Sequence, residues 1–238
     1  SVKCFHAWRR IAAMKPVPVV HTDGRAVILD LSRGAALCGR SIAGLEVEEL
    51  GQLIDQAMLE AGTQFSFGRY AEPRDLYSND NFANGGSDET RTVHMGIDVF
   101  CAAGTPVHTP LDATVAHLAN NDQELDYGPV VILRHQDAGD AVFFSLYGHL
   151  GVDVLDQLLV GQSVVAGEQI ATVGEPPTNG NWPPHLHFQL INDLLNLGVD
   201  FPGVALRSRQ DFWLDLSPSP ARFFPEVAAD SLDYAEVP

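Results

Sequence analysis

The chain has 238 residues, with 14 Lys and Arg against 31 Asp and Glu, so its formal net charge is −17. Phosphate backbones and anionic membrane surfaces would repel such an acidic chain, which argues against nucleic acids and membranes as partners. Hydrophobic residues make up 45% of the chain. No apolar run approaches the ~20 residues that a membrane span requires, so we expect a folded globular protein.

Residues 1–90 are expected to form an N-terminal extension. Residues 25–32 (RAVILDLS) are typical of a short buried strand. In residues 45–62, apolar side chains recur at intervals of three and four, which predicts an amphipathic helix ended by Gly62. The predicted apolar face consists of Leu50, Leu53, Ile54, Ala57, Met58 and Ala61. Residues 64–86 then read as an irregular segment rich in aromatic and turn-forming residues.

Residues 91–192 are expected to form a β-rich core, followed by a C-terminal extension with an acidic tail at 193–238. Short apolar runs separated by glycines and prolines favour a mainly β fold. Residues 158–174 place glycines between short apolar runs, as in a hairpin or a small barrel turn. The predicted strands are VHMGIDVF (93–100), TVAHL (114–118), PVVILRH (129–135), AVFFSLYGHL (141–150), QIATV (169–173) and HLHFQLI (185–191).

Five polar residues in this region have spacings that metal chemistry uses. His185 and His187 are two apart on a predicted strand and share one face, while their apolar neighbours face the core. His94 and Asp98 are four apart, and His149 follows an apolar strand. A hydrolytic zinc site takes three protein ligands and leaves a fourth position open, so two His and one Asp would suffice. Each pattern alone also fits an ordinary polar strand face.

Together, the HMGID, YGHL and PHLHFQ motifs resemble the lysostaphin and LytM type of zinc peptidase, over about residues 91–190. GTPVHTPLDATV (104–115) and VVAGEQI (164–170) are similar to further stretches of that family. The resemblance implies an antiparallel β-sheet groove with a small second sheet and a short N-terminal helix. It also implies a metallopeptidase or amidase with one Zn²⁺ per chain, bound by His94, Asp98 and His187, and a catalytic pair formed by His149 and His185.

The loop before the HLH motif departs from the family pattern. Many relatives have a Gly-Ser/Thr-Thr-Gly turn there, whereas this chain has GEPPTNGNWPPHLH (174–187), with four prolines and Trp182. Because proline stiffens a loop, we expect a fixed, bulky rim that favours a small peptide or amide substrate. The alternatives are a secreted peptidoglycan endopeptidase and a non-catalytic peptide- or metal-binding module of a multidomain enzyme.

A second resemblance concerns the flanks. They are similar to the middle region of large bacterial proteins that also carry a kinase-like and a class III aminotransferase-like domain, which implies a cytoplasmic module. The opening residues lack the pattern of a signal peptide, and three well-separated cysteines also favour a reducing compartment. A location in the cell envelope is the alternative, if a signal peptide was trimmed. A cupin barrel is disfavoured because no glutamate follows closely after the HLH motif.

The remaining histidines lack partners at ligand spacing, and we expect surface or hydrogen-bonded roles for them. They are His6, His21, His108, His117 and His135.

Overall fold

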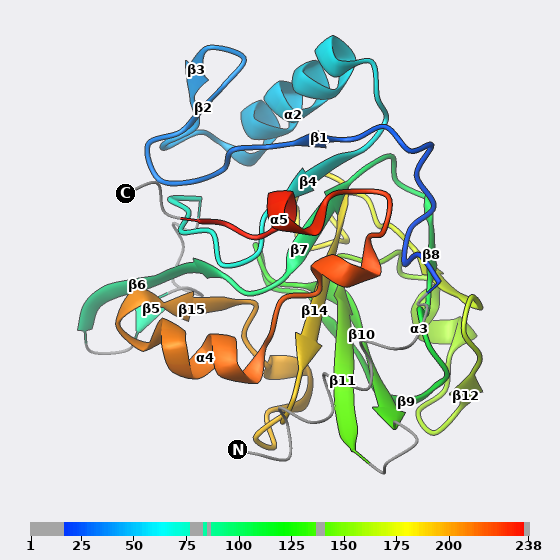
Figure 1. The fold of residues 1–238 in the computed structure, drawn as a ribbon. Helices are drawn as coiled ribbons and strands as arrows, with labels where there is room; N and C mark the ends of the chain where they lie inside the picture. Colours follow the sequence, from blue (N-terminus) through cyan, green and yellow to red (C-terminus); the bar gives the residue numbers. More distant parts are fainter. Residues whose placement is uncertain (1–16, 77–82, 85–86, 137–140, 236–238) are drawn as a thin grey trace.

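A computed structural model describes residues 17–76, 83–84, 87–136 and 141–235. An eight-stranded sheet lies at its centre, in the order β1-β4-β7-β14-β11-β10-β9-β12 (Figure 1). Its neighbouring strands run antiparallel except for β1 and β4, which run parallel, so the sheet is mixed rather than purely antiparallel. The strands are β1 Val27–Ile28, β4 Ser66–Gly68, β7 Ile97–Phe100, β14 His185–Ile191, β11 Val142–Gly148, β10 Gly128–Gln136, β9 Ala113–Asn121 and β12 Ser163–Val164.

In the described residues, three small sheets surround the central one, and their pairing corrects two expectations. The predicted strand at 93–100 is broken at Met95–Gly96, because its first part pairs with β15 in a small sheet and its second part is β7. Residues 158–174 form no hairpin: β12 pairs with β9, whereas β13 pairs with β8. The small sheets consist of β15 Val204–Leu206, β6 Ser87–His94 and β5 Ala83–Asn84; β13 Gln169–Thr172 and β8 Pro106–His108; and β2 Ala36–Leu37 and β3 Arg40–Ser41.

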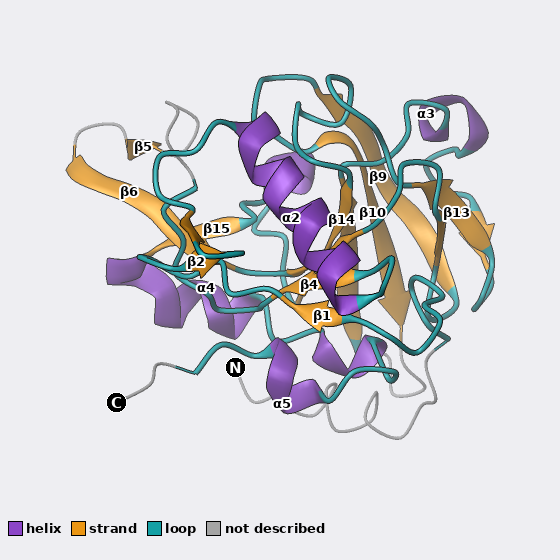
Figure 2. Cartoon of the chain, turned by 90° about the horizontal axis from the view of Figure 1, so that it is seen from above, coloured by secondary structure: helices purple, strands orange, loops and turns teal. Residues whose placement is uncertain are grey.

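The predicted helix is present as α2 (Val47–Ala61), which crosses above β1 and β4 in Figure 2. Its buried side chains are Leu50, Leu53 and Ile54, whereas Ala61 is exposed and does not belong to the packed face. Gly62 adopts φ 66° and its N–H bonds to a carbonyl of the last turn, which ends the helix as expected. The other α-helices are α3 Val154–Gln157, α4 Gln210–Leu216 and α5 Ala229–Leu232. Among the described residues, no helix has the length and apolar character needed to cross a membrane.

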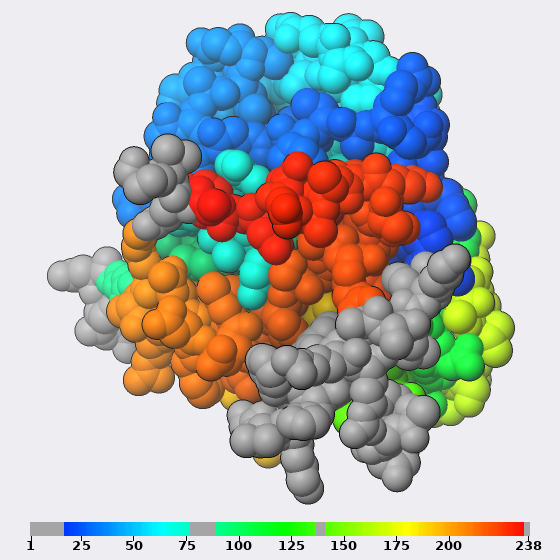
Figure 3. Space-filling view, in the orientation of Figure 1, coloured from blue at the N-terminus to red at the C-terminus, as the bar shows by residue number. Residues whose placement is uncertain are grey.

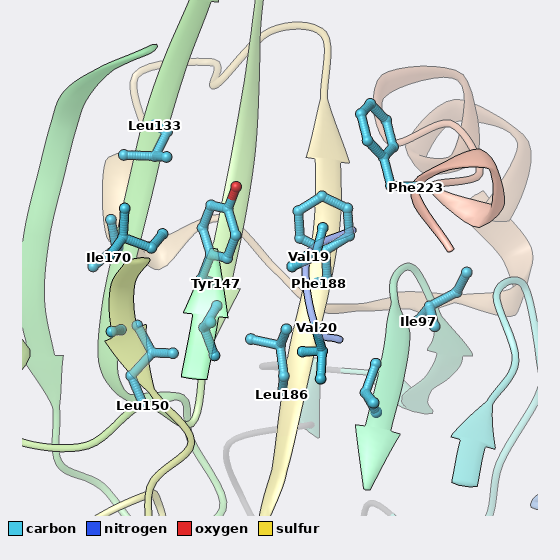
Figure 4. Close-up of a cluster of buried hydrophobic side chains, with 14 of the residues drawn as sticks. Val19, Val20, Ile97, Leu133, Tyr147, Leu150, Ile170, Leu186, Phe188 and Phe223 are labelled. Carbon is cyan, nitrogen blue, oxygen red and sulfur yellow. The ribbon is translucent and has the colours of Figure 1, made fainter. Parts of the chain in front are cut away.

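The main hydrophobic core packs against one face of the central sheet. Leu186 and Phe188 of β14 point into it beside Tyr147 of β11 and Ile97 of β7 (Figure 4). These alternate with His185 and His187 on the same strand, which therefore face the other side. Val19 and Val20, near the start of the described residues, and Leu232, near their end, also belong to this core.

The two terminal segments pack against each other and against the sheet. Figure 3 shows the C-terminal segment, in red, lying along the blue N-terminal residues. The Tyr70 N–H donates to the carbonyl of Leu232, and the rings of Phe67 and Phe224 meet edge to face at 5.4 Å. The N-terminal residues also contribute β1 and β4 to the central sheet, so they share one hydrogen-bonded structure with the core.

Candidate functional site

The register of β14 brings two of the predicted site residues together. His187 pairs with Asp98 of β7 on one side and with Gly148 of β11 on the other. Directly opposed residues of antiparallel strands project on the same face, so the imidazole and the carboxylate meet. His185, two residues earlier on the same face, stacks on Phe100 with ring centroids 4.8 Å apart.

The other two histidines reach this face from strand ends. His94 is the last residue of β6, and the break at Met95–Gly96 turns its side chain toward β14. A Cβ on Gly96 would lie 2.7 Å from Cε1 of His187, so only glycine fits there. His149 follows β11 in the left-handed region, at φ 61°, which is uncommon for a residue other than glycine. All five predicted site residues therefore line one cavity.

Three ligand atoms form a nearly equilateral triangle. The distances are 3.1 Å between His94 Nε2 and His187 Nδ1, 3.1 Å between His94 Nε2 and Asp98 Oδ1, and 3.1 Å between His187 Nδ1 and Asp98 Oδ1. Ligand atoms bound to a tetrahedral zinc would be about 3.3 Å apart. Among the described residues these three form a group that could hold a metal ion, and each is buried.

Neighbouring groups set the proton positions on both imidazoles of the triangle. His94 Nδ1 lies 2.9 Å from the carbonyl oxygen of Arg69, which only accepts, so Nδ1 carries the hydrogen and Nε2 a lone pair. His187 Nε2 donates to Oε1 of Gln189 at 2.9 Å, which leaves the lone pair on Nδ1. The Gln189 amide is itself oriented by donating to Ser217 Oγ. Three lone-pair atoms thus converge, an arrangement that a cation stabilises.

The protonation states suit metal binding. Burial lowers the pKa of His94 to about 4, with a further contribution from the charge of Arg74. Burial alone would raise the pKa of Asp98, but neighbouring His94, Arg74 and His187 outweigh it and hold this pKa well below its usual range. At neutral pH the site therefore offers a neutral imidazole and a carboxylate, the forms that bind a metal.

His149 and His185 form a pair beside the triangle. Their ring centroids are 4.3 Å apart, and His185 Nε2 lies 3.8 Å from Asp98 Oδ1. Each donates its Nδ1 hydrogen to a backbone carbonyl, that of Asn179 and that of Pro183 respectively, so each Nε2 carries a lone pair. Burial lowers the pKa of both imidazoles, and both are therefore neutral bases at neutral pH.

The cavity has a volume of about 300 Å³. Trp182, 8% exposed, and Pro183 form part of its wall together with Leu50 of α2. The Asn179 side-chain amide donates to the Trp182 carbonyl, while the backbone carbonyl of Asn179 accepts from His149, so one residue ties the loop to the histidine. Besides Asp98, the charged residues on the wall are Arg74, Arg91, Asp126 and Asp200.

The groups that orient the ligands were not predicted from the sequence. Gln189 could have been noticed, because it stands two residues after His187 and so shares its strand face. Arg74, which donates to Asp98 Oδ2 at 2.6 Å, gave no such signal because it is 24 residues away. Tyr127 is buried on the cavity wall and donates through its hydroxyl to the Phe201 carbonyl.

The other described histidines lie outside this cavity. His135 is buried, with Nδ1 bonded to the Asp112 carbonyl and Nε2 to Ser145 Oγ, and His21 and His108 meet edge to face at 4.8 Å. His117 is half-buried on β9. His6 falls outside the described residues.

Comparisons with known proteins find similarity to a peptidase family over part of the chain. Residues 92–197 match the sequence model of Peptidase family M23. The chain is 35% identical over 115 residues to an uncharacterized metalloprotease of Haemophilus influenzae, covering 47% of this chain and 22% of that protein. It is 31% identical over 99 residues to the uncharacterized lipoprotein YgeR of Escherichia coli, covering 41% and 34%. It thus spans about a third of the length of YgeR and less than a quarter of the Haemophilus protein.

Among solved structures, the catalytic domain of the antimicrobial peptidase lysostaphin from Staphylococcus simulans aligns with a TM-score of 0.39 and 23% identity. The alignment covers 63% of this chain and 92% of that one.

Proposed function

We propose that the peptidase M23 domain at residues 92–197 makes this chain a zinc-dependent hydrolase that cleaves a peptide or amide bond in a small substrate. The observation that carries the proposal is the arrangement of five side chains in one cavity. Three buried ligand atoms lie 3.1 Å from one another, and two neutral histidines stand beside them. A site used only to bind metal for structure would have four ligands and no such pair.

We propose His94, Asp98 and His187 as the residues that hold one zinc ion. Their spacing and proton positions fit zinc. When bound, zinc supplies Lewis acidity at an open fourth position for water or a substrate carbonyl.

His149 and His185 would move the protons. Each presents an Nε2 lone pair, so one of them can take a proton from the attacking water as general base. The resulting imidazolium can give that proton to the leaving amine. The second histidine, also neutral, can accept a hydrogen bond from the attacking water and orient it, while the imidazolium donates to the oxyanion that forms on the carbonyl. The backbone carbonyls of Asn179 and Pro183 hold both rings in the orientation that this chemistry requires.

Cavity size and charge support a small substrate. A space of about 300 Å³, lined in part by the Trp182 loop and by α2, fits a short peptide better than a polymer strand. Gly180 packs so closely on Asp126 that a Cβ there would clash with its carbonyl, which supports a fixed loop. The net charge of −17 also disfavours contact with an anionic cell wall.

The test compares two kinds of substrate. The zinc-loaded chain is incubated with short peptides and aminoacyl amides, and separately with purified peptidoglycan followed by turbidity. We expect hydrolysis of small substrates, lost in His149→Ala and kept in His117→Ala, whose imidazole lies outside the cavity. Rapid zinc-dependent clearing of the walls would instead identify a murein endopeptidase. Binding of peptides without hydrolysis would identify a binding module.

We also propose that the chain works in the cytoplasm beside kinase-like and aminotransferase-like domains. The similarity of its flanks to such fusion proteins supports this, as does its use of cysteine: Cys38 and Cys101 are free thiols. Sequencing the gene around this segment tests the fusion, and fractionation of cells that produce the protein tests the location.

A further inference from the structure

A buried arginine stands directly behind the metal-binding triangle. Arg74 is 3% exposed, and its Nη1 donates to Oδ2 of Asp98 at 2.6 Å. The other oxygen, Oδ1, is the one that faces His94 and His187. The two oxygens of Asp98 are therefore engaged by different partners, one by the guanidinium and one by the ligand triangle.

Glu72 holds the arginine in place. Its carboxylate is fully buried, and Oε2 accepts from Arg74 Nε at 2.9 Å. Its other oxygen, Oε1, accepts from Nε and Nη2 of Arg69 and from the N–H of Leu31. Arg69 also reaches Asp30 at 2.6 Å. Positive and negative groups therefore alternate from the protein surface to the metal ligand.

The same segment fixes a second ligand. The Arg69 carbonyl accepts from His94 Nδ1, and the backbone of His94 bonds to Ala71 and Glu72 on either side. Gly68 pairs with Asp98 in the sheet, and a Cβ on Gly68 would lie 2.5 Å from Arg74 Nη2, so this glycine makes room for the guanidinium. Residues 68–74 thus surround two of the three ligands, yet they lie outside the stretch that matches family M23.

A buried ion chain is a weak means of stabilising a fold, because desolvation offsets most of the Coulomb attraction. Its effect on Asp98 is more specific. A carboxylate with two free oxygens can bind a metal through both, and the second would take the position that water or substrate needs. With Oδ2 held by a guanidinium, only Oδ1 is available.

We propose that Arg74, held by Glu72, is a positioning residue that restricts Asp98 to one-oxygen ligation and so keeps the fourth position of the metal open. The inference rests on the zinc site of the proposed function. It adds that residues 68–74 are an integral part of that site, although they precede the family region.

The experiment uses the metal alone as the probe. Zinc affinity is measured by competition with a chromophoric chelator, and coordination by the visible absorption of the Co²⁺-substituted protein, in wild type, Arg74→Gln, Arg74→Lys and Glu72→Gln. The matched control is Arg33→Gln, which breaks the Arg33–Asp75 pair (2.8 Å) on the surface. Circular dichroism and urea unfolding report whether each variant folds.

We expect Arg74→Gln to bind zinc about 10- to 100-fold more weakly and to show weaker cobalt bands, as coordination expands beyond four. Glu72→Gln should weaken zinc binding and the cobalt bands by a smaller factor. Arg74→Lys should retain part of the zinc affinity because it keeps the positive charge. Arg33→Gln should match wild type. If Arg74→Gln does not fold, Arg74→Lys and Glu72→Gln decide.

Folded variants with wild-type affinity and cobalt spectrum would overturn this inference while leaving the proposed function intact. A wild-type chain that binds no zinc would overturn the proposed function itself.

Discussion

Replacing His135 with Gln should change how stability responds to pH without affecting catalysis. His135 is 2% exposed and lies outside the catalytic cavity, hydrogen-bonded to the Asp112 carbonyl and Ser145. Burial lowers its pKa to about 4, against the smaller opposing effects of Asp112. In the unfolded chain the same imidazole titrates near its ordinary value of about 6.5.

The direction and size of this pH effect on stability follow from the linkage between proton binding and folding. Because the folded pKa is depressed, the unfolded state binds more protons between the two values. The stabilisation is therefore complete above about pH 6.5 and is lost as the pH falls toward 4. At about pH 4.5 the loss attributable to His135 is about 2.5 kcal/mol, with no discount for solvent because the group is buried.

Urea unfolding of the metal-free protein, at about pH 7.5 and about pH 4.5, measures this effect. We expect the free energy of unfolding of wild type to fall by about 2.5 kcal/mol more than that of His135→Gln, while both hydrolyse small substrates equally when zinc-loaded. Equal losses in the two proteins would show that His135 is not a buried neutral imidazole. A loss of turnover in His135→Gln would place it in the catalytic machinery instead.

Three further predictions concern the site. By elemental analysis, His187→Ala should lose most of its zinc and His185→Ala should retain it; equal loss in both would contradict the ligand assignment. His149→Ala and His185→Ala should each reduce turnover by ~10²-fold or more with zinc bound. Their buried imidazoles have lowered pKa values, so the acid limb of the wild-type pH profile should lie below about 6.5, and a flat profile would refute their role. In Gly96→Ala the new Cβ would lie 2.7 Å from His187, so the free energy of unfolding should fall by about 1–3 kcal/mol and zinc should bind more weakly. The control is Gly51→Ala, in α2, where the nearest neighbour of the new Cβ is 3.5 Å away; this variant should be as stable as wild type or more stable.

The sequence predicts those elements correctly whose structure follows from a local repeat of apolar residues. The alternation along 185–191 predicts that His185 and His187 share a face, and the structure places both in the cavity. The spacing of apolar residues predicts α2 and its end at Gly62. Both patterns are set within a few residues of chain, so the expectation needs no knowledge of distant contacts.

The predictions that were wrong concern pairing between segments far apart in the sequence. The residues at 93–100 do not themselves indicate that β6 pairs with β15 in a small sheet whereas β7 belongs to the central sheet. The division depends on β15, which lies more than 100 residues further along the chain. In the same way, residues 158–174, expected to form a hairpin or a small barrel turn, divide between two sheets. Arg74 is identifiable as part of the site only when β4 and β7 are paired in space.

We propose that zinc held by His94, Asp98 and His187 drives hydrolysis in this cavity. A titration of the metal-free chain with zinc tests this directly, if bound metal and cleavage of a small peptide substrate are followed together. We expect activity to rise in proportion to bound zinc up to one ion per chain, with His187→Ala silent at every point. Full activity in the metal-free protein, or one bound zinc per chain with no hydrolysis of any peptide, amide or peptidoglycan substrate, would show that zinc at this site does not drive hydrolysis.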